Sequence, residues 1–226
     1  ITYIGYETFK NCTGLRILNF SSGLNKIDQY AFQGCTAIQS IVFPDTLEYI
    51  NGHAFADCFA LKSVQFPESL KEVFIYAFQN TALTEVVIPE SVVRLNNGVF
   101  KDCKSLKTAT IKGSLSVASG DYLFENCTSL QKVILSDDIE DIGVEAFFNC
   151  TSLQQINIPK RTAIIGDRAF KNCSNLKSAI VMQYVGTIGS EAFNGCTSLP
   201  SVQFSTSLEE IGQQAFYNCQ GLTSVT

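Results

Sequence analysis

Residues 31–52 read AFQGCTAIQSIVFPDTLEYING, and residues 54–73 repeat nearly the same pattern as AFADCFALKSVQFPESLKEV. The repeated unit is easiest to follow through its phenylalanine, which returns at intervals of 22 to 24 residues. The ten copies are Phe9, Phe32, Phe55, Phe78, Phe100, Phe124, Phe147, Phe170, Phe193 and Phe216. A fixed period between about 20 and 50 residues is typical of a solenoid. The sequence therefore predicts ten stacked coils of about 23 residues.

Each unit contains two short extended pieces. In the first, apolar Ile41 and Phe43 alternate with an exposed position, which is strand spacing. A proline such as Pro44 often follows and ends the strand, because it lacks an amide donor. A polar turn then leads to a second piece, such as LEYI at residues 47–50. Five coils place a glycine after that piece, which indicates a tight corner; these are Gly5, Gly143, Gly166, Gly189 and Gly212.

The remaining segment, AF-x-x-C, is too short for a stable helix, so a single helical or 3₁₀ turn is expected. One coil alone cannot bury its apolar residues, whereas stacked coils bury them in one continuous core. We therefore expect a mainly β solenoid, and a single one, over residues 1–226.

Two coils depart from the pattern. Coil four reads AFQNTALTEV, which is one residue short and has no cysteine. Coil six reads IKGSLSVASGDYLFENC, with Ser119 where isoleucine is expected and with two glycines, Gly113 and Gly120. The sequence predicts that coil six bulges or loops out there, as a lip beside the sheet or as simple drift in a tolerant corner.

The two ends of the sequence lack polar caps. The chain opens with ITYIG, inside a corner, and stops with LTSVT, inside a strand. Because a solenoid needs capped ends, we expect the chain to be a piece of a longer protein.

The phrase NCTSLxxIxIPxxxxxIGxxAFxxC, read from residues 149–173, resembles the BspA-like leucine-rich repeat. That family occurs in surface proteins of oral and gut bacteria and of some parasitic protists. The resemblance covers the whole chain. It implies a right-handed leucine-rich repeat coil whose SIVF-type strands form a parallel sheet on the concave face, with short extended or 3₁₀ segments on the convex side. It also implies a secreted or surface-displayed protein that takes part in adhesion.

Composition excludes several classes of protein. The formal charge of −5 gives no electrostatic reason to expect nucleic acid or an anionic membrane. Since there is no run of 18 apolar residues, no membrane insertion by this segment is expected.

The residues that usually carry chemistry are explained by the repeat. Nine cysteines form a column three residues after the phenylalanine, without the close pairs that metal sites use. Stacked thiols point in parallel, which is poor disulfide geometry, so we expect free, buried cysteines. His53 is the only histidine and is expected to be exposed without a role. Four of five sequons lie in the same turn column, where asparagine stabilises the turn. No catalytic, metal or cofactor site is predicted, and the chain is expected not to be an enzyme.

The candidate binding face is the set of outward residues on the SIVF-type strands. They are Ile17/Asn19, Ser40/Val42, Ser63/Gln65, Glu85/Val87, Thr108/Thr110, Lys132/Ile134, Gln155/Asn157, Ser178/Ile180 and Ser201/Gln203. The flanking column adds a basic edge with Lys62 and Lys107, while the turns after the strands hold an acidic edge with Asp137 and Asp138. The predicted binding residues are those in the middle: Lys62, Ser63, Gln65, Glu85, Val87, Lys107, Thr108, Thr110, Lys132 and Ile134.

Two functions remain open at this point. One is a protein-binding or adhesion module, extracellular or at the cell surface, whose partner is a protein or glycan of a host or neighbouring cell. The other is a spacer stalk that holds another domain away from the cell. A ligand face should carry an unusual patch, whereas a spacer should look alike all round.

Overall fold

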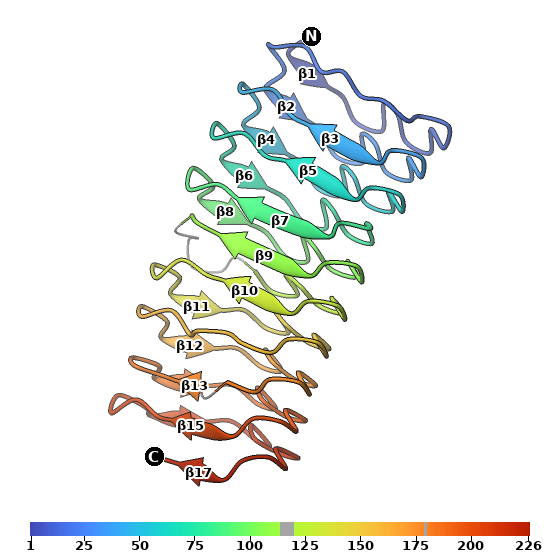
Figure 1. The fold of residues 1–226 in the computed structure, drawn as a ribbon. Helices are drawn as coiled ribbons and strands as arrows, with labels where there is room; N and C mark the ends of the chain where they lie inside the picture. The colour runs from blue at the N-terminus through green and yellow to red at the C-terminus, as the bar shows by residue number, and fades with distance from the viewer. Residues whose placement is uncertain (114–119, 179) are drawn as a thin grey trace.

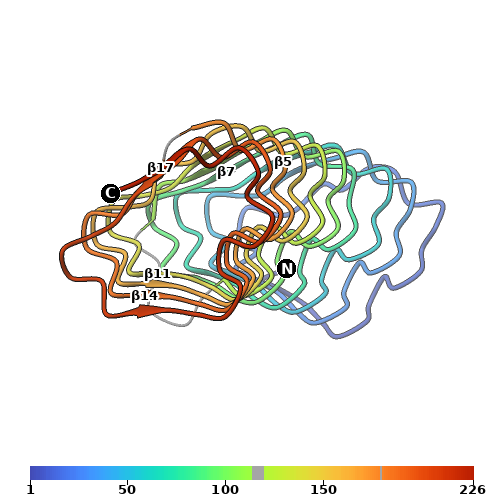
Figure 2. The same cartoon turned by 90° about the horizontal axis from the view of Figure 1, so that it is seen from below.

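The computed structural model describes residues 1–113, 120–178 and 180–226. Coils follow one another in sequence order from the N-terminus to the C-terminus, and each coil lies directly against the next (Figure 1). Seen along the stack, successive coils are progressively displaced, so the first and last coils do not superimpose (Figure 2). The solenoid prediction is confirmed. The bulge expected around Ser119 lies outside the described residues.

One face of the solenoid is a parallel sheet of the SIVF-type strands, here called the front sheet. Its strands are β3 (Ser40–Val42), β5 (Ser63–Gln65), β7 (Glu85–Ile88), β9 (Thr108–Ile111), β10 (Lys132–Ile134), β13 (Ile180–Val181), β15 (Ser201–Gln203) and β17 (Ser224–Val225). They pair as β3-β5, as β7-β9-β10 and as β13-β15-β17. Coil seven joins this face through one bridge, between Lys132 and Gln155.

The opposite face holds the second extended pieces, here called the back sheet. Its strands are β1 (Tyr3–Ile4), β2 (Lys26–Ile27), β4 (Tyr49–Ile50), β6 (Glu72–Val73), β8 (Arg94–Leu95), β11 (Asp141–Ile142), β12 (Ile164–Ile165), β14 (Thr187–Ile188) and β16 (Glu210–Ile211). They pair in order as β1-β2-β4-β6-β8 and as β11-β12-β14-β16, always parallel.

The core lies between the two sheets and runs along the stack. In β7, Val86 and Ile88 are buried while Glu85 and Val87 are exposed, as the alternation in sequence predicts. The back strands contribute their second residue, such as Ile50 and Val73. Buried residues of all coils from two to ten form one hydrophobic cluster, which is what stacking of incomplete repeats requires.

The AF-x-x-C segments form a ribbon of consecutive turns along the side of the solenoid. Alternate amides donate along the chain and across to the next coil: Gln33 N donates to Tyr30 O at 3.1 Å, whereas Phe32 N donates to Ala54 O at 2.8 Å. This pattern keeps only half of the i→i+3 bonds of the expected 3₁₀ turn, and no helix forms in the described part of the chain.

Two residues in each coil of this ribbon adopt left-handed backbone conformations. One column holds Asn, Asp or Gly, which tolerate a positive φ. The other holds bulky residues such as Tyr30, His53 and Arg168, at φ values of 59°, 55° and 53°. Each of these costs about 1 kcal/mol of strain, which the hydrogen bonds to the next coil offset.

The phenylalanine column stacks ring on ring through the ribbon. Neighbouring centroids are 5.1 Å apart at Phe32 and Phe55 and 5.0 Å apart at Phe170 and Phe193, with nearly parallel rings. The distance widens to 5.9 Å between Phe78 and Phe100. The widest spacing therefore falls on coil four, the coil that is one residue short.

The cysteine column beside it is held by a repeated hydrogen bond. Each thiol from Cys35 onward points at the phenylalanine carbonyl of the preceding coil; Cys150 Sγ lies 3.2 Å from Phe124 O. In coil four Thr81 takes this place, but its hydroxyl donates to Phe78 of its own coil at 3.0 Å. Within the described residues, Phe55 is thus the one carbonyl of this column, from Phe9 to Phe193, that receives no thiol.

The turn asparagines form a third ladder, through their side chains. Asn172 Nδ2 donates to Asn149 Oδ1 at 2.8 Å, Asn149 to Asn126 at 2.9 Å, and Asn126 to Asp102 Oδ1 at 3.0 Å. The sequence predicted a turn role for these residues, and the structure adds a contact between coils. The nitrogen that would carry a glycan in these three sequons is therefore already engaged.

The corner glycines from Gly143 onward pack directly against the preceding coil. A Cβ on Gly189 would lie 2.5 Å from Asp167 N, and one on Gly212 would lie 2.4 Å from Ser190 N. Because backbone atoms cannot give way as a side-chain end can, these positions exclude any side chain. The glycine is required for close approach rather than for a positive φ.

We predict that Gly189→Ala lowers the midpoint of chemical denaturation, because overpacking against backbone costs about 1–3 kcal/mol. Gly186→Ala is the matched control, since its nearest neighbour, Ser207 O, is 3.6 Å away. That control should leave the midpoint unchanged or raise it slightly. Equal effects of the two substitutions would contradict the close-approach assignment.

We also predict the thiol reactivity of the native chain. All nine cysteines are free, as expected, but Cys12 is exposed and Cys219 half-buried, which corrects the expectation that the whole column is buried. Burial raises the pKa of the Cys58 thiol to about 12 and holds that of Cys150 well above its ordinary value. Titration with a thiol reagent should modify Cys12 rapidly, Cys219 slowly, and the other seven only after unfolding.

Cys12→Ser serves as the control, because it should abolish the rapid phase without changing the number of thiols released on unfolding by more than one. Rapid native modification of Cys127 or Cys150 would show that the column is open to solvent.

Candidate functional site

The predicted binding residues lie together on the outward side of β5, β7, β9 and β10. Strand register places Glu85, Thr108 and Lys132 in one row and Val87, Thr110 and Ile134 in the next. Thr108 and Thr110 are half-buried, and the other members of the set are exposed. Their proximity follows from the alternation read in the sequence; their binding role stays a prediction.

One outward pair was assigned wrongly in the sequence. Ile180 is buried, at 1% exposure, and pairs with the inward Val202, whereas Val181 points outward at 53% exposure. In coil eight the inward isoleucine, Ile180, comes four positions after Leu176, whereas in the preceding coil Ile156 comes three positions after Leu153. A shift of one residue reverses which side chains face the core.

A hollow of about 400 Å³ opens in the front sheet between β5 and β7. Within the described residues, no strand pairing links these two neighbours, although each pairs normally with the strand on its other side. Coil four, which supplies β7, is the coil that lacks one residue. Five of the predicted binding residues line the hollow together with Glu68: Lys62, Ser63, Gln65, Glu85 and Val87.

The two charged edges differ in how their charges are paired. At the acidic edge, Lys160 Nζ lies 3.0 Å from Asp137 and Arg161 lies 3.4 Å from Asp138, so cations of the next coil partly neutralise the acids. Neither Lys62 nor Lys107 takes part in an ion pair among the described residues. The basic edge therefore keeps its charge available to a partner.

His53 is part of an aromatic stack and not an exposed side chain, which corrects the sequence expectation. Its ring is half-buried and lies 4.9 Å from the ring of Tyr30 and 5.2 Å from that of Tyr76. Burial lowers the pKa of His53, which favours the neutral ring in this stack.

In the part of the chain that the structure describes, no three histidine, cysteine or acidic side chains are grouped to hold a metal ion. Nor does a helix long and apolar enough to cross a bilayer occur in that part.

The repeat pattern and the stacked fold can be compared with known families. The family model described as the BspA type leucine rich repeat region, in six copies, matches residues 1–107 and 117–226. The chain belongs to this BspA-type leucine-rich repeat family. Leucine-rich repeats of this kind are in general not enzymes and act as protein-interaction modules. No curated protein matches the chain.

Solved structures of bacterial leucine-rich repeat proteins share the fold. A leucine-rich repeat protein from Bacteroides ovatus is 28% identical, with a TM-score of 0.80 over all of this chain and 70% of that one. A leucine rich cell surface protein from Faecalibacterium prausnitzii is 26% identical, with a TM-score of 0.58 over all of this chain and 69% of its own. The leucine rich repeat protein of T. pallidum is 32% identical over 71% of this BspA-type chain and 74% of that protein, with a TM-score of 0.61.

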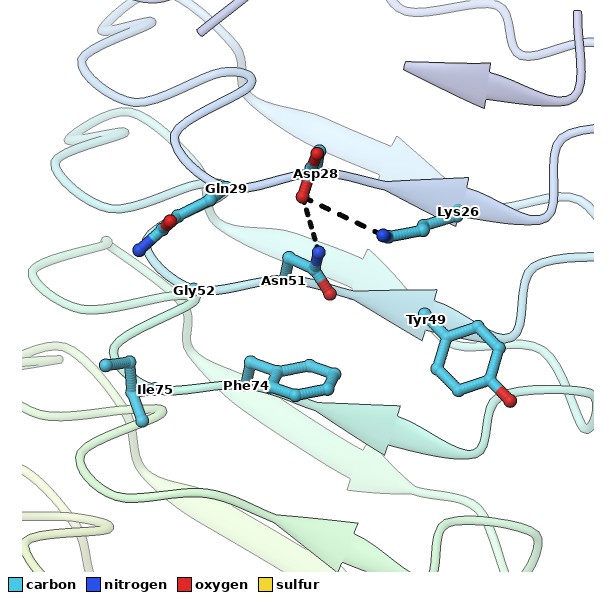
Figure 3. A pocket seen from close by; sticks show the side chains of 8 residues that line it. All are labelled: Lys26, Asp28, Gln29, Tyr49, Asn51, Gly52, Phe74 and Ile75. Atoms are coloured by element: carbon cyan, nitrogen blue, oxygen red, sulfur yellow. Dashed lines mark hydrogen bonds and ion pairs between the residues drawn. The ribbon is translucent and has the colours of Figure 1, made fainter. Parts of the chain in front are cut away.

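Sequence analysis missed a second hollow, on the back sheet. It measures about 510 Å³ and is lined by Lys26, Asp28, Gln29, Tyr49, Asn51, Gly52, Phe74 and Ile75, from coils two to four (Figure 3). The signal was present in the corner column, where Asp28, Asn51 and Phe74 stand at the position that is glycine in the regular coils.

Asp28 organises the polar end of this back-sheet hollow. It accepts hydrogen bonds from the Tyr3 hydroxyl and from Asn51 Nδ2, the latter at 2.5 Å, and Lys26 Nζ lies 4.0 Å away. Burial alone would raise the pKa of Asp28, but these hydrogen bonds outweigh it and hold the pKa below its usual value. The carboxylate is therefore ionised and fixed in place.

Proposed function

We propose that this chain is a non-enzymatic adhesion module, secreted or displayed at the cell surface, that binds a protein partner from a host or neighbouring cell across its front sheet. The observation that carries the proposal is the hollow between β5 and β7, at one of the places where strand pairing in the front sheet is interrupted. Membership of an interaction-repeat family supports it, as does the likeness to a protein described as a leucine rich cell surface protein.

The front sheet suits a macromolecular partner on physical grounds. Its side chains stand on strands held by the coils beneath, so little ordering cost is added on binding. The hollow combines apolar Val87 with Lys62 and Glu85, which gives a partner both an anchor and directional contacts. A protein partner would span several coils and bury at least about 1,000 Å² in total.

The spacer alternative predicts a surface that is alike from coil to coil. Coils two to four carry two hollows, one on each sheet. This difference between these coils and the regular ones supports binding over a purely structural stalk.

The proposal is tested with an array of immobilised extracellular-matrix proteins, followed by variants measured against the strongest partner found. The double variant Lys62→Glu with Lys107→Glu, and separately Val87→Arg, should each reduce affinity at least about tenfold, because the first reverses the charge of the basic edge and the second places a charge in the middle of the face. The measurement is surface plasmon resonance at fixed salt.

The matched control is the double reversal Asp137→Lys with Asp138→Lys on the acidic edge, which should change affinity less than about twofold. The front-sheet assignment is wrong if the acidic-edge variant abolishes binding while the three front-sheet substitutions leave it unchanged.

A further inference from the structure

The back-sheet hollow arises from a local change in the corner column. In coils seven to ten a glycine lies so close to the preceding coil that a Cβ would come within 2.8 Å of its backbone. In coils two to four the same column holds Asp28, Asn51 and Phe74 instead. These three side chains cannot be accommodated by the regular close approach, and the space around them is the hollow.

The groups facing this space combine polar and apolar character without net charge. Lys26 and Asp28 offset one another, and the Asp28 carboxylate is already held by Asn51. Because Asn51 Nδ2 donates to Asp28, the side-chain oxygen of Asn51 points toward the hollow (Figure 3). Gln29 adds a second side-chain amide, so donors and acceptors stand close together.

Two aromatic side chains form the apolar part of the lining. In Figure 3, Phe74 lies below Asn51 and Tyr49 lies to the right of both, with its hydroxyl pointing away from them. Both side chains are half-buried, which fixes their position while leaving ring surface accessible. The volume of about 510 Å³ falls within the range of small-molecule sites, roughly 300–1,000 Å³.

We propose that the back-sheet hollow is a binding site for neutral sugar residues of an oligosaccharide. A pyranose ring presents C–H groups on its faces, which pack on aromatic rings, and hydroxyls at its rim, which both donate and accept hydrogen bonds. The rings of Phe74 and Tyr49 can pack against the C–H faces, and the amides of Asn51 and Gln29 can hydrogen-bond with the hydroxyls. Offset charges at Lys26 and Asp28 disfavour a strongly anionic or cationic ligand, for which an unpaired charge of opposite sign would be needed.

This site is independent of the protein-binding face, because the two lie on opposite sheets. A substitution on the front sheet, such as Val87→Arg, should therefore leave sugar binding unchanged. Failure of either proposal can be recognised without reference to the other.

The test uses the folded chain with maltotriose, cellotriose and N,N′,N″-triacetylchitotriose as neutral probes and 3′-sialyllactose as the anionic one. Nitrogen-15 amide spectra are recorded during each titration. We expect at least one neutral probe to bind and to shift the amide signals of Gln29, Asn51, Gly52 and Ile75. This mapping uses the unmodified chain, so it does not depend on the folding of any variant.

Variants then assign the contacts. Asn51→Ala and Phe74→Ala should each weaken binding of that probe at least about tenfold. Asn96→Ala is the matched control, since Asn96 holds the same column one coil further on and lies outside the hollow; it should have no effect. The proposal is overturned if no neutral probe binds, if only the sialylated probe binds, or if the shifts map to another surface.

Discussion

Every coil of this solenoid has to meet the next with its ribbon amides and its phenylalanine ring in register. A ring-to-ring distance close to 5 Å and backbone bonds such as Phe32 N to Ala54 O set the same spacing. That spacing matches the distance between strands in a sheet, so ribbon, front sheet and back sheet can all advance together. The period of 23 residues agrees with this shared spacing. Coil four, which is one residue short, keeps its ribbon bonds and its back-sheet pairing to coil three, but among the described residues its front strand does not pair with β5.

Where the chain breaks this constraint, the surface changes. Coil four is one residue short, and its threonine bonds within its own coil. Among the residues that the structure describes, the Phe55 carbonyl receives no thiol and β7 does not pair with β5. On the back sheet the corner glycine is replaced in coils two to five, and the hollow lies at the first three of these coils. The regular coils make the scaffold, while the irregular ones make the features that a ligand can recognise.

Much of the fold was predictable because the same pattern of apolar, cysteine and turn residues occurs in ten successive repeats. The Phe and Cys columns, the alternation in β7 and the glycine corners each follow from elementary packing or strand geometry. The left-handed column was not predictable, because Tyr30, His53 and Arg168 are not residues that favour a positive φ. Contacts between coils impose it.

The candidate site was also predictable only in part. The alternation of apolar and polar residues predicted correctly that Ser63, Glu85 and Val87 point outward. It failed at Ile180, because one additional residue after Leu176 reverses which side chains of the strand face the core. The back-sheet hollow required knowing that a corner Cβ would meet the preceding backbone. The spacing of residues in the sequence does not reveal the distance between a corner Cβ and the backbone of the preceding coil.

The central claim, that coil length fixes the pairing of coils and thereby the hollow between β5 and β7, is tested by restoring the missing residue. Insertion of cysteine between Asn80 and Thr81 turns AFQNTAL into AFQNCTAL and gives coil four the regular length; insertion of serine there separates length from the thiol. A crystal structure of the cysteine insertion should show the new thiol at the Phe55 carbonyl, β5 paired with β7 and the hollow closed, and the chain should unfold at higher denaturant. An unpaired β5 and β7 with an unchanged hollow would contradict the account.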